Sequence, residues 1–166
     1  MRLRLARSED FPALLALNAE SVHFLSPLTA ARLEQLHSRA AYHKVIESDD
    51  GIAAFLLAFR EGADYDSPNY LWFAERYPAF LYIDRIVVAP AHRGKGLGVL
   101  LYEDIAEIAT AAGVPWLACE FDLEPPNPAS MKFHARMGFG EVGRQWLGGG
   151  KKQVSLQAKP VPTSVS

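Results

Sequence analysis

Apolar and polar residues alternate along this chain in patterns that predict short strands and helices. Leu3 and Leu5 alternate with arginines and predict a first strand, and apolar residues at helical spacing predict a helix over residues 9–21. We expect Ser8 to cap this helix, and Thr29 to cap a second one, because a hydroxyl oxygen accepts a hydrogen bond from a free N–H of the first turn.

Runs of apolar residues predict six further strands, at residues 41–47, 52–59, 80–88, 116–121, 140–147 and 153–158. Helices are expected at 99–112 and from Asn127 to about residue 137. A hairpin followed by strand–helix–strand units predicts an α/β (α+β) fold, with a mixed, twisted central sheet of about seven strands flanked by helices. We expect one domain over residues 1–159 and a flexible tail over 160–166.

Composition narrows the classes of partner. The formal net charge is -2, so neither nucleic acid nor an anionic membrane surface is an expected partner. No run approaches the roughly 20 apolar residues that span a bilayer. The one cysteine, Cys119, suits a reducing compartment, and no leader segment is visible, so we expect a cytoplasmic protein. The five histidines are scattered without ligand spacing, and no metal is expected.

A glycine-rich loop follows the clearest strand, which ends Ile86-Val87-Val88. From residue 93 the loop contains Arg93, Gly94, Lys95, Gly96, Leu97 and Gly98, and a helix follows. Three glycines in five residues allow backbone N–H groups to converge, and the helix start adds a partial positive charge, so the loop suits a pyrophosphate. The spacing fits neither the P-loop nor the dinucleotide fingerprint. From the spacing alone, a basic turn that binds no ligand is the alternative interpretation.

The loop and a second stretch together resemble the GNAT superfamily of N-acetyltransferases. In the first, Arg93-x-x-Gly96-x-Gly98 lies between a strand and an amphipathic helix. In the second, Asn127 opens a helix that ends at Gly138-Phe139, as in the family's last helix segment. Two motifs in the family's order are far more specific than either one, and the order of elements matches over nearly the whole chain.

The resemblance implies that acetyl-CoA is bound as the acetyl donor. Backbone groups of the strand end would bind the pantetheine arm, the glycine loop would hold the pyrophosphate, and the last helix would lie beside the pantetheine. The implied residues are Ile86, Val87, Val88, Arg93, Gly94, Lys95, Gly96, Leu97, Gly98, Val99, Asn127, Ser130 and Phe133.

The implied reaction is direct attack of a neutral amine on the acetyl thioester, which requires a proton acceptor. Glu120 is the first candidate base, Asp84 the second and Asp122 the third, although each carboxylate also suits an ion pair or a solvated strand edge. Many relatives place a tyrosine as general acid where this chain has His134. This histidine suits proton transfer near neutral pH, and a structural role for it stays equally open.

The acceptor is not specified by any motif. The aromatic residues of an insertion at 62–79 are expected to pack in the core or at a homodimer interface. The alternative is that they form the wall of an acceptor pocket. We favour a small amine or an amino-acid-like metabolite as acceptor. A protein N-terminal or lysine acetyltransferase and a non-catalytic acyl-CoA-binding module are the alternatives.

Overall fold

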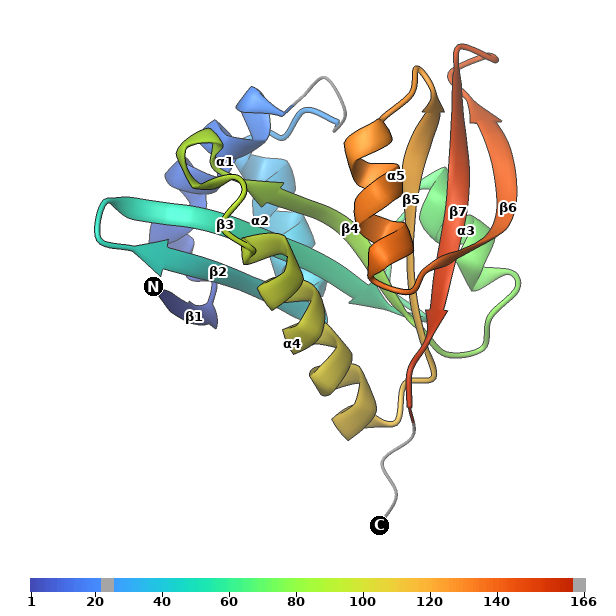
Figure 1. The fold of residues 1–166 in the computed structure, drawn as a ribbon, viewed down its shortest axis with the longest axis horizontal. Coiled ribbons are helices and arrows are strands. Elements are labelled where there is room, and N and C mark those ends of the chain that lie inside the picture. The colour runs from blue at the N-terminus through green and yellow to red at the C-terminus, as the bar shows by residue number, and fades with distance from the viewer. Residues whose placement is uncertain (22–25, 163–166) are drawn as a thin grey trace. The chain divides into compact units, whose positions relative to one another are not determined.

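The computed structural model describes residues 1–21 and 26–162 (Figure 1). The strands are β1 (Arg2–Leu5), β2 (Tyr42–Ser48), β3 (Gly51–Arg60), β4 (Leu81–Val88), β5 (Trp116–Glu124), β6 (Gly140–Leu147) and β7 (Lys152–Pro160). The helices are α1 (Phe11–Glu20), α2 (Ala30–Arg39), α3 (Pro68–Ala74), α4 (Leu97–Ala112) and α5 (Pro128–Arg136), with short 3-10 turns η1 (Ser8–Asp10) and η2 (Pro90–His92).

The strands form one seven-stranded sheet in the order β1-β2-β3-β4-β5-β7-β6. The β4–β5 pair is parallel, whereas β1–β2, β2–β3, β5–β7 and β6–β7 are antiparallel. The predicted mixed sheet with flanking helices is therefore confirmed. The chain divides into two compact units, the first made of Met1–Phe59 and Ile83–Ile105, the second of Arg60–Tyr82 and Ala106–Ser166. One domain over residues 1–159 stays a prediction.

The core of the first unit lies between α1, α2 and the sheet. Leu14, Leu33, Val45 and Phe55 are fully buried there, and Val87 of β4 joins them. Burial of each such side chain stabilises the fold by about 1.5–3 kcal/mol relative to exposure. This core holds the strand that leads into the glycine loop.

The beginning of α1 differs from the prediction, whereas α2 begins as predicted. Thr29 Oγ1 accepts a hydrogen bond from Arg32 N at 3.1 Å and caps α2. Ser8 is not a cap: it lies inside η1, and the Arg7 N–H donates instead to Asp10 Oδ2 at 2.8 Å. Arg7 thus takes the N-cap position, and the Asp10 carboxylate three residues later binds its N–H.

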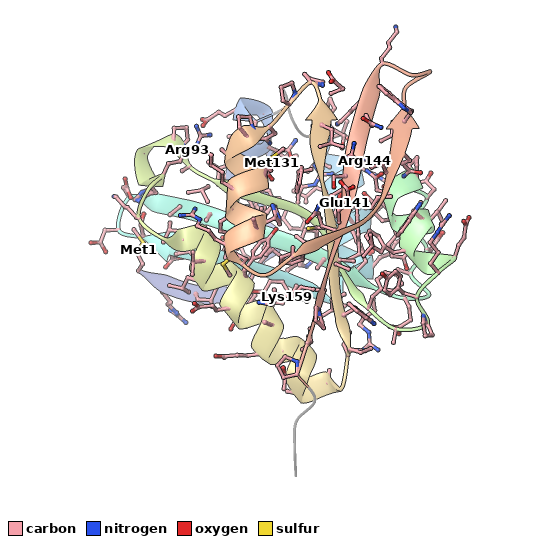
Figure 2. All side chains as sticks on the ribbon, turned by 45° about the vertical axis from the view of Figure 1, so that its right-hand side comes forward. Met1, Arg93, Met131, Glu141, Arg144 and Lys159 are labelled. Carbon is pink, nitrogen blue, oxygen red and sulfur yellow. The ribbon has the colours of Figure 1, made fainter. Side chains whose placement is uncertain are left out.

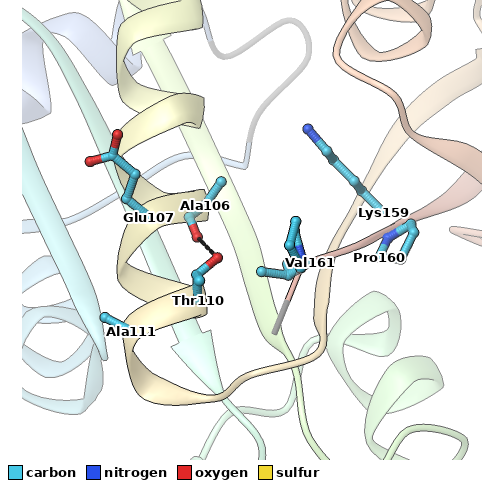
Figure 3. A pocket seen from close by; sticks show the side chains of 8 residues that line it. Ala106, Glu107, Thr110, Ala111, Lys159, Pro160 and Val161 are labelled. Carbon is cyan, nitrogen blue, oxygen red and sulfur yellow. Dashed lines mark hydrogen bonds between the residues drawn. The ribbon is translucent and has the colours of Figure 1, made fainter. Parts of the chain in front are cut away.

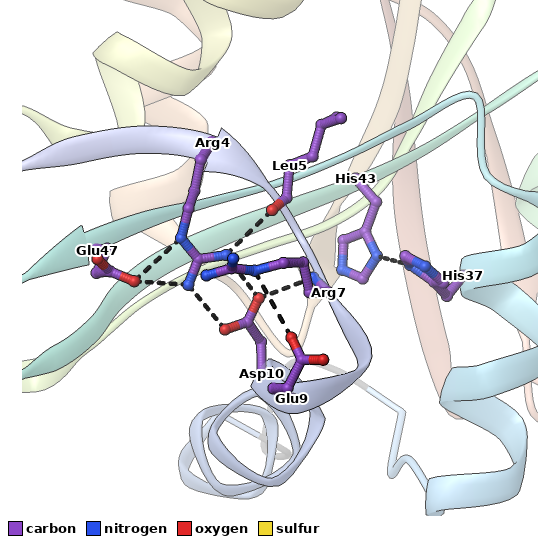
Figure 4. A network of polar contacts seen from close by, with 8 residues as sticks. All are labelled: Arg4, Leu5, Arg7, Glu9, Asp10, His37, His43 and Glu47. Atoms are coloured by element: carbon purple, nitrogen blue, oxygen red, sulfur yellow. Dashed lines mark hydrogen bonds and ion pairs between the residues drawn. The ribbon is translucent and has the colours of Figure 1, made fainter.

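The same Asp10 joins an ion-pair network around Arg4 (Figure 4). The Arg4 guanidinium donates to both carboxylate oxygens of Asp10 at 2.8 Å and to Glu47 Oε2 at 2.6 Å. The guanidinium lowers the pKa of the Asp10 carboxyl below its usual value. The contacts tie β1 to η1 and β2, so they stabilise the edge of the sheet in the first unit.

In the second unit, α3 and α5 lie on opposite faces of the sheet (Figure 1). The ring of Phe121 on β5 lies 5.8 Å from the His134 ring of α5. The adjacent residue, Glu120, points to the other face and contacts Asn69 of α3. This alternation is the normal pleat of a strand. It gives the two candidate residues, Glu120 and His134, different surroundings.

The aromatic insertion is more regular than predicted. We expected one helical turn around residues 71–75, but α3 begins at Pro68, whose fixed φ suits the first helical position. Tyr70 and Phe73 are 1% and 0% exposed, which confirms a core role for these two. Trp72 packs so closely on β6 that a Cβ added at Gly143 would lie 2.4 Å from its ring. The insertion thus fixes α3 to β6.

The structure places the first residues of the predicted tail, Pro160 and Val161, in contact with the fold. Pro160 is the last residue of β7, and the Val161 N–H donates to the Pro115 carbonyl at 2.8 Å. Val161 is 7% exposed, so apolar burial holds this position as well. Residues 163–166 of the predicted tail lie outside the described residues.

An apolar cavity of about 590 Å³ lies in the second unit between the end of α4 and the end of β7 (Figure 3). Its walls are formed by Ala106, Glu107, Thr110, Ala111, Lys159, Pro160, Val161 and Pro162. None of the candidate site residues lines it, so we do not assign the reaction to this cavity. Within residues 1–21 and 26–162, no helix is long and apolar enough to cross a membrane.

Candidate functional site

The glycine loop adopts the backbone conformation that its sequence predicts. Gly94 and Gly96 have φ values of 79° and 78°, in the left-handed region that other residues rarely adopt. A Cβ added at either position would meet no atom within 4 Å. Glycine is therefore required here by the backbone conformation and not by crowding, which leaves open space above the loop.

Helix α4 begins directly after the loop. In its first turn, Leu100 N donates a hydrogen bond to Gly96 O at 3.1 Å. The N–H groups of Leu97, Gly98 and Val99 precede this bond and have no carbonyl partner within the helix. Together with the helix dipole, they favour an anion such as a pyrophosphate.

Charged side chains surround the loop. Lys95 Nζ lies 3.3 Å from His92 Nδ1, and His92 Nε2 lies 3.4 Å from Asp50 Oδ1. An ammonium only donates, so Nδ1 accepts and the neutral ring carries its proton on Nε2, facing Asp50. Arg93 is exposed (Figure 2). Two cations thus flank the exposed glycines.

Side chains of the strand before the loop alternate between the core and the opposite face. Val87 points into the core of the first unit, while Ile86 and Val88, on the opposite face by the period of the strand, are half-buried. This position is compatible with the pantetheine contacts that we expect of Ile86 and Val88, which stay predictions.

Glu120 lies in a polar cluster of the second unit. Its Oε1 accepts hydrogen bonds from Asn69 Nδ2 at 2.8 Å and from the Tyr82 hydroxyl at 2.5 Å. Asn69 in turn accepts from Gln145 Nε2 at 2.7 Å. These bonds orient the Glu120 carboxylate. The geometry suits the predicted base.

The second candidate base, Asp84, is committed to a buried ion pair. Its Oδ2 lies 2.6 Å from Arg85 Nε, and the two side chains are 5% and 4% exposed. The Arg85 guanidinium also donates to Asn18 Oδ1 at 2.8 Å and to the Ser26 carbonyl at 3.2 Å. Breaking a buried pair of this kind costs about 3–5 kcal/mol. These contacts favour the ion-pair alternative for Asp84.

The contacts of two other residues on β5, Asp122 and Cys119, favour a structural role for both. Asp122 Oδ1 lies 3.2 Å from Lys152 Nζ, and the Asp122 side chain is 7% exposed. Cys119 is buried, and burial raises the pKa of its thiol well above the usual value. A thiol held in its neutral form is a poor nucleophile, so Cys119 acts as a small apolar residue.

The α5 segment contains the remaining candidates. Asn127 caps the helix as predicted, with its side-chain oxygen accepting from Ser130 N at 3.3 Å. His134 Nδ1 lies 2.8 Å from the Ser130 carbonyl and 3.1 Å from its hydroxyl. Phe133 is half-buried, and its ring meets the His134 ring edge-on at 5.3 Å. The contact of α5 with coenzyme A stays a prediction.

The protonation of His134 follows from these contacts. A carbonyl only accepts, so Nδ1 carries the proton and the neutral ring has its lone pair on Nε2. Burial lowers the pKa of His134 below its usual value. At neutral pH the ring is therefore mainly uncharged and better suited to accept a proton at Nε2 than to donate one. Its predicted role as general acid needs a direct test.

The structure thus joins some candidates with residues that sequence analysis missed. Asn69, Tyr82 and Gln145 contact Glu120 directly or through one another, although they are far apart in the sequence. No motif marked them, and the positions of Tyr82 and Gln145 on predicted strands were the signal that the sequence gave. Within the described parts of the chain, no group of three or more His, Cys, Asp or Glu side chains suits a metal ion.

The strand, the left-handed glycine loop and the start of the next helix together form a main-chain arrangement that suits a phosphate group. The family model described as "Acetyltransferase (GNAT) family" matches residues 5–139. The chain therefore belongs to the GNAT acetyltransferase family, as the sequence predicted. No curated protein matches it.

Solved structures agree in fold. The ribosomal-protein-S18-alanine N-acetyltransferase from Escherichia coli is 16% identical over 99% of this chain and 96% of that chain, with a TM-score of 0.74. Chaetomium thermophilum Naa20, in complex with a bisubstrate analogue, is 22% identical over 97% and 87%, with a TM-score of 0.78. A putative phosphinothricin N-acetyltransferase is 22% identical over 97% and 98%, with a TM-score of 0.73. At these identities the likeness shows the fold.

Proposed function

We propose that this protein is an acetyl-CoA-dependent N-acetyltransferase that transfers the acetyl group directly to a primary amine. The observation that carries the proposal is the loop with left-handed Gly94 and Gly96 directly before α4, in a member of the GNAT family. Acetyl-CoA supplies the activated thioester. The loop amides and the Arg93 and Lys95 side chains bind its pyrophosphate.

Glu120 acts as the base in this proposal. Its carboxylate takes a proton from the ammonium form of the acceptor, and the free amine then forms the new C–N bond as the C–S bond breaks. Backbone N–H groups near Val87 and Val88 stabilise the charge on the carbonyl oxygen. C–N bond formation leaves one further proton on the nitrogen, and the thiolate leaves with the electron pair and takes up that proton. His134, uncharged in the ground state, stays the candidate that accepts this proton at Nε2 and donates it to the sulfur.

A small amine or an amino-acid-like metabolite is the acceptor that we favour. The close contact of Trp72 with Gly143 seals α3 against β6 on the Glu120 face of the second unit. An extended peptide cannot insert between these two elements. This packing supports a compact acceptor. Acetylation of a protein N-terminus or of a lysine side chain would instead replace the small amine as the proposed acceptor.

The test measures release of free coenzyme A in the presence of small amines, amino acids and short peptides. Wild type should turn over at least one amine, and Glu120→Gln should lower kcat by about 100-fold or more, as loss of a general base typically does. Gln153→Leu, on the other face of the sheet, is the matched control. Tight acetyl-CoA binding with no turnover of any amine would instead indicate a binding module.

Location and assembly are separate proposals. We propose a cytoplasmic location, since the single Cys119 is compatible with a reducing compartment. We also keep a homodimer as a proposal. Cell fractionation tests the first, and light scattering of the purified protein tests the second.

A further inference from the structure

Two neutral amide side chains connect β6 to the candidate base through α3. Gln145 Nε2 lies 2.7 Å from Asn69 Oδ1, and Asn69 Nδ2 lies 2.8 Å from Glu120 Oε1. We call Gln145, Asn69 and Glu120 the amide relay. All three residues belong to the second unit.

The direction of each hydrogen bond follows from the chemistry of the groups. An ionised carboxylate only accepts, so the amide nitrogen of Asn69 must face Glu120. Its oxygen then faces Gln145, which must present its own nitrogen. If the Asn69 amide turned over, its oxygen would oppose the Glu120 carboxylate. The Glu120 carboxylate thus sets the direction of both bonds, and Gln145 holds Asn69 in the donating orientation by satisfying its oxygen.

The backbone around the relay is rigidly packed. Asn69 is 8% exposed and lies beside the fully buried Tyr70 in α3. Trp72 packs against Gly143, two residues before Gln145 in β6, and the Arg76 guanidinium lies 4.2 Å above the Trp72 ring. These contacts hold the two amides at a fixed separation. Buried polar groups in such a network keep a unique geometry when all are satisfied.

We infer that Asn69 and Gln145 are positioning residues, which hold the Glu120 carboxylate ionised and oriented to receive the proton of the acceptor amine. This inference rests on the proposed function. Neither amide takes up the proton itself: Asn69 acts on Glu120, and Gln145 acts through Asn69.

Several groups of the second unit lie near Glu120. Tyr82 on β4 donates to the same carboxylate oxygen, and Asp122 lies two residues along β5 and is paired with Lys152. The adjacent Cys119 thiol is neutral, and on β7 the residue opposite Glu120 is the apolar Leu156. The amide of Asn69 thus donates to Oε1 together with the Tyr82 hydroxyl.

The kinetic test uses Asn69→Ala, Gln145→Leu and the double variant, with Gln153→Leu as the control. Loss of the donor removes stabilisation of the charged carboxylate, so the acidic limb of the kcat/KM profile should move to higher pH. On the acidic limb we expect each single variant to lose about tenfold in kcat/KM, the equivalent of one hydrogen bond to a charged group. The KM for acetyl-CoA should not change.

The double variant separates a relay from two independent structural effects. If Gln145 acts through Asn69, Gln145→Leu has no further effect once Asn69 is alanine, so the two losses are not additive. Additive losses, or an acidic limb that stays in place in Asn69→Ala, would overturn the inference. Asn69→Asp, which keeps the shape of the side chain, should shift the limb furthest because a second carboxylate then opposes Glu120.

The relay can also be tested by a measurement that does not require acetylation of an amine. Carbon NMR of the glutamate carboxyls, with Glu120 assigned through Glu120→Gln, measures the ionisation of Glu120 directly. The relay requires a lower titration midpoint in wild type than in Asn69→Ala and in Gln145→Leu. Equal midpoints would refute the relay whatever the enzyme activity, whereas an inactive wild type with shifted midpoints would refute only the proposed function.

Discussion

Acid should destabilise the first unit through His43. This side chain is 5% exposed, and its Nδ1 lies 2.8 Å from His37 Nδ1 on α2 (Figure 4). Burial, and then the charge of His37, lower the pKa of His43 from 6.5 to about 4, while Asp10 opposes the shift. The imidazolium form is therefore much less favourable in the folded protein than in the unfolded chain.

The effect of pH on the free energy of unfolding follows from the difference between the folded and unfolded pKa values of His43. The unfolded chain binds a proton near pH 6.5 and the folded protein only near pH 4, so stability is complete above pH 6.5 and falls as the pH drops between these values. From about pH 7.5 to about pH 4.5 this single group should remove about 2.5 kcal/mol of the free energy of unfolding. That is a large part of the roughly 5–15 kcal/mol of a typical domain.

Urea unfolding of wild type and of His43→Leu at both pH values isolates the effect. Other groups titrate in both proteins, so the quantity of interest is the difference between them. Between the two pH values wild type should lose about 2.5 kcal/mol more than the variant. Parallel losses in the two proteins would show that His43 is protonated in the folded state, and the reasoning from burial would be wrong. His37→Leu should give a smaller pH effect than wild type, since one repelling charge is gone.

Three further predictions concern the loop, the α3–β6 contact and the last helix. Gly94→Ala should cost about 1–2 kcal/mol of loop stability, because φ is 79° there, and should weaken acetyl-CoA binding measured by calorimetry; unchanged affinity would show that the loop does not hold the ligand. Gly143→Ala should lower stability by about 1–3 kcal/mol through overlap with Trp72, and Trp72→Leu should relieve most of that loss in thermal unfolding; an unchanged melting temperature in the single variant would contradict the packing. His134→Ala should lower turnover and His134→Tyr should restore it if position 134 donates the proton; full activity in both would remove His134 from the mechanism.

Local patterns were sufficient for much of the fold and for the loop. The apolar run that forms β4, the glycines that follow it and the cap at Asn127 all depend on neighbours a few residues away. The local sequence pattern gave the wrong capping residue at the start of the first helix, where two neighbouring side chains were candidates. Ser8 and Asp10 both had the chemistry to bind a free N–H, and the ion pair of Asp10 with Arg4 favours the carboxylate.

The surroundings of the candidate base depended on the tertiary structure alone. Asn69 and Gln145 are ordinary polar residues in the sequence, and they meet because Trp72 seats α3 on β6 beside Gly143. Likewise, the sequence allowed Asp84 to be a base, an ion-pair partner or a solvated residue of a strand. The burial of both Asp84 and Arg85 in the structure favours the ion pair. Periodicity and glycine patterns record the local backbone, whereas hydrogen bonds between side chains distant in sequence arise only once the packed elements bring them within reach.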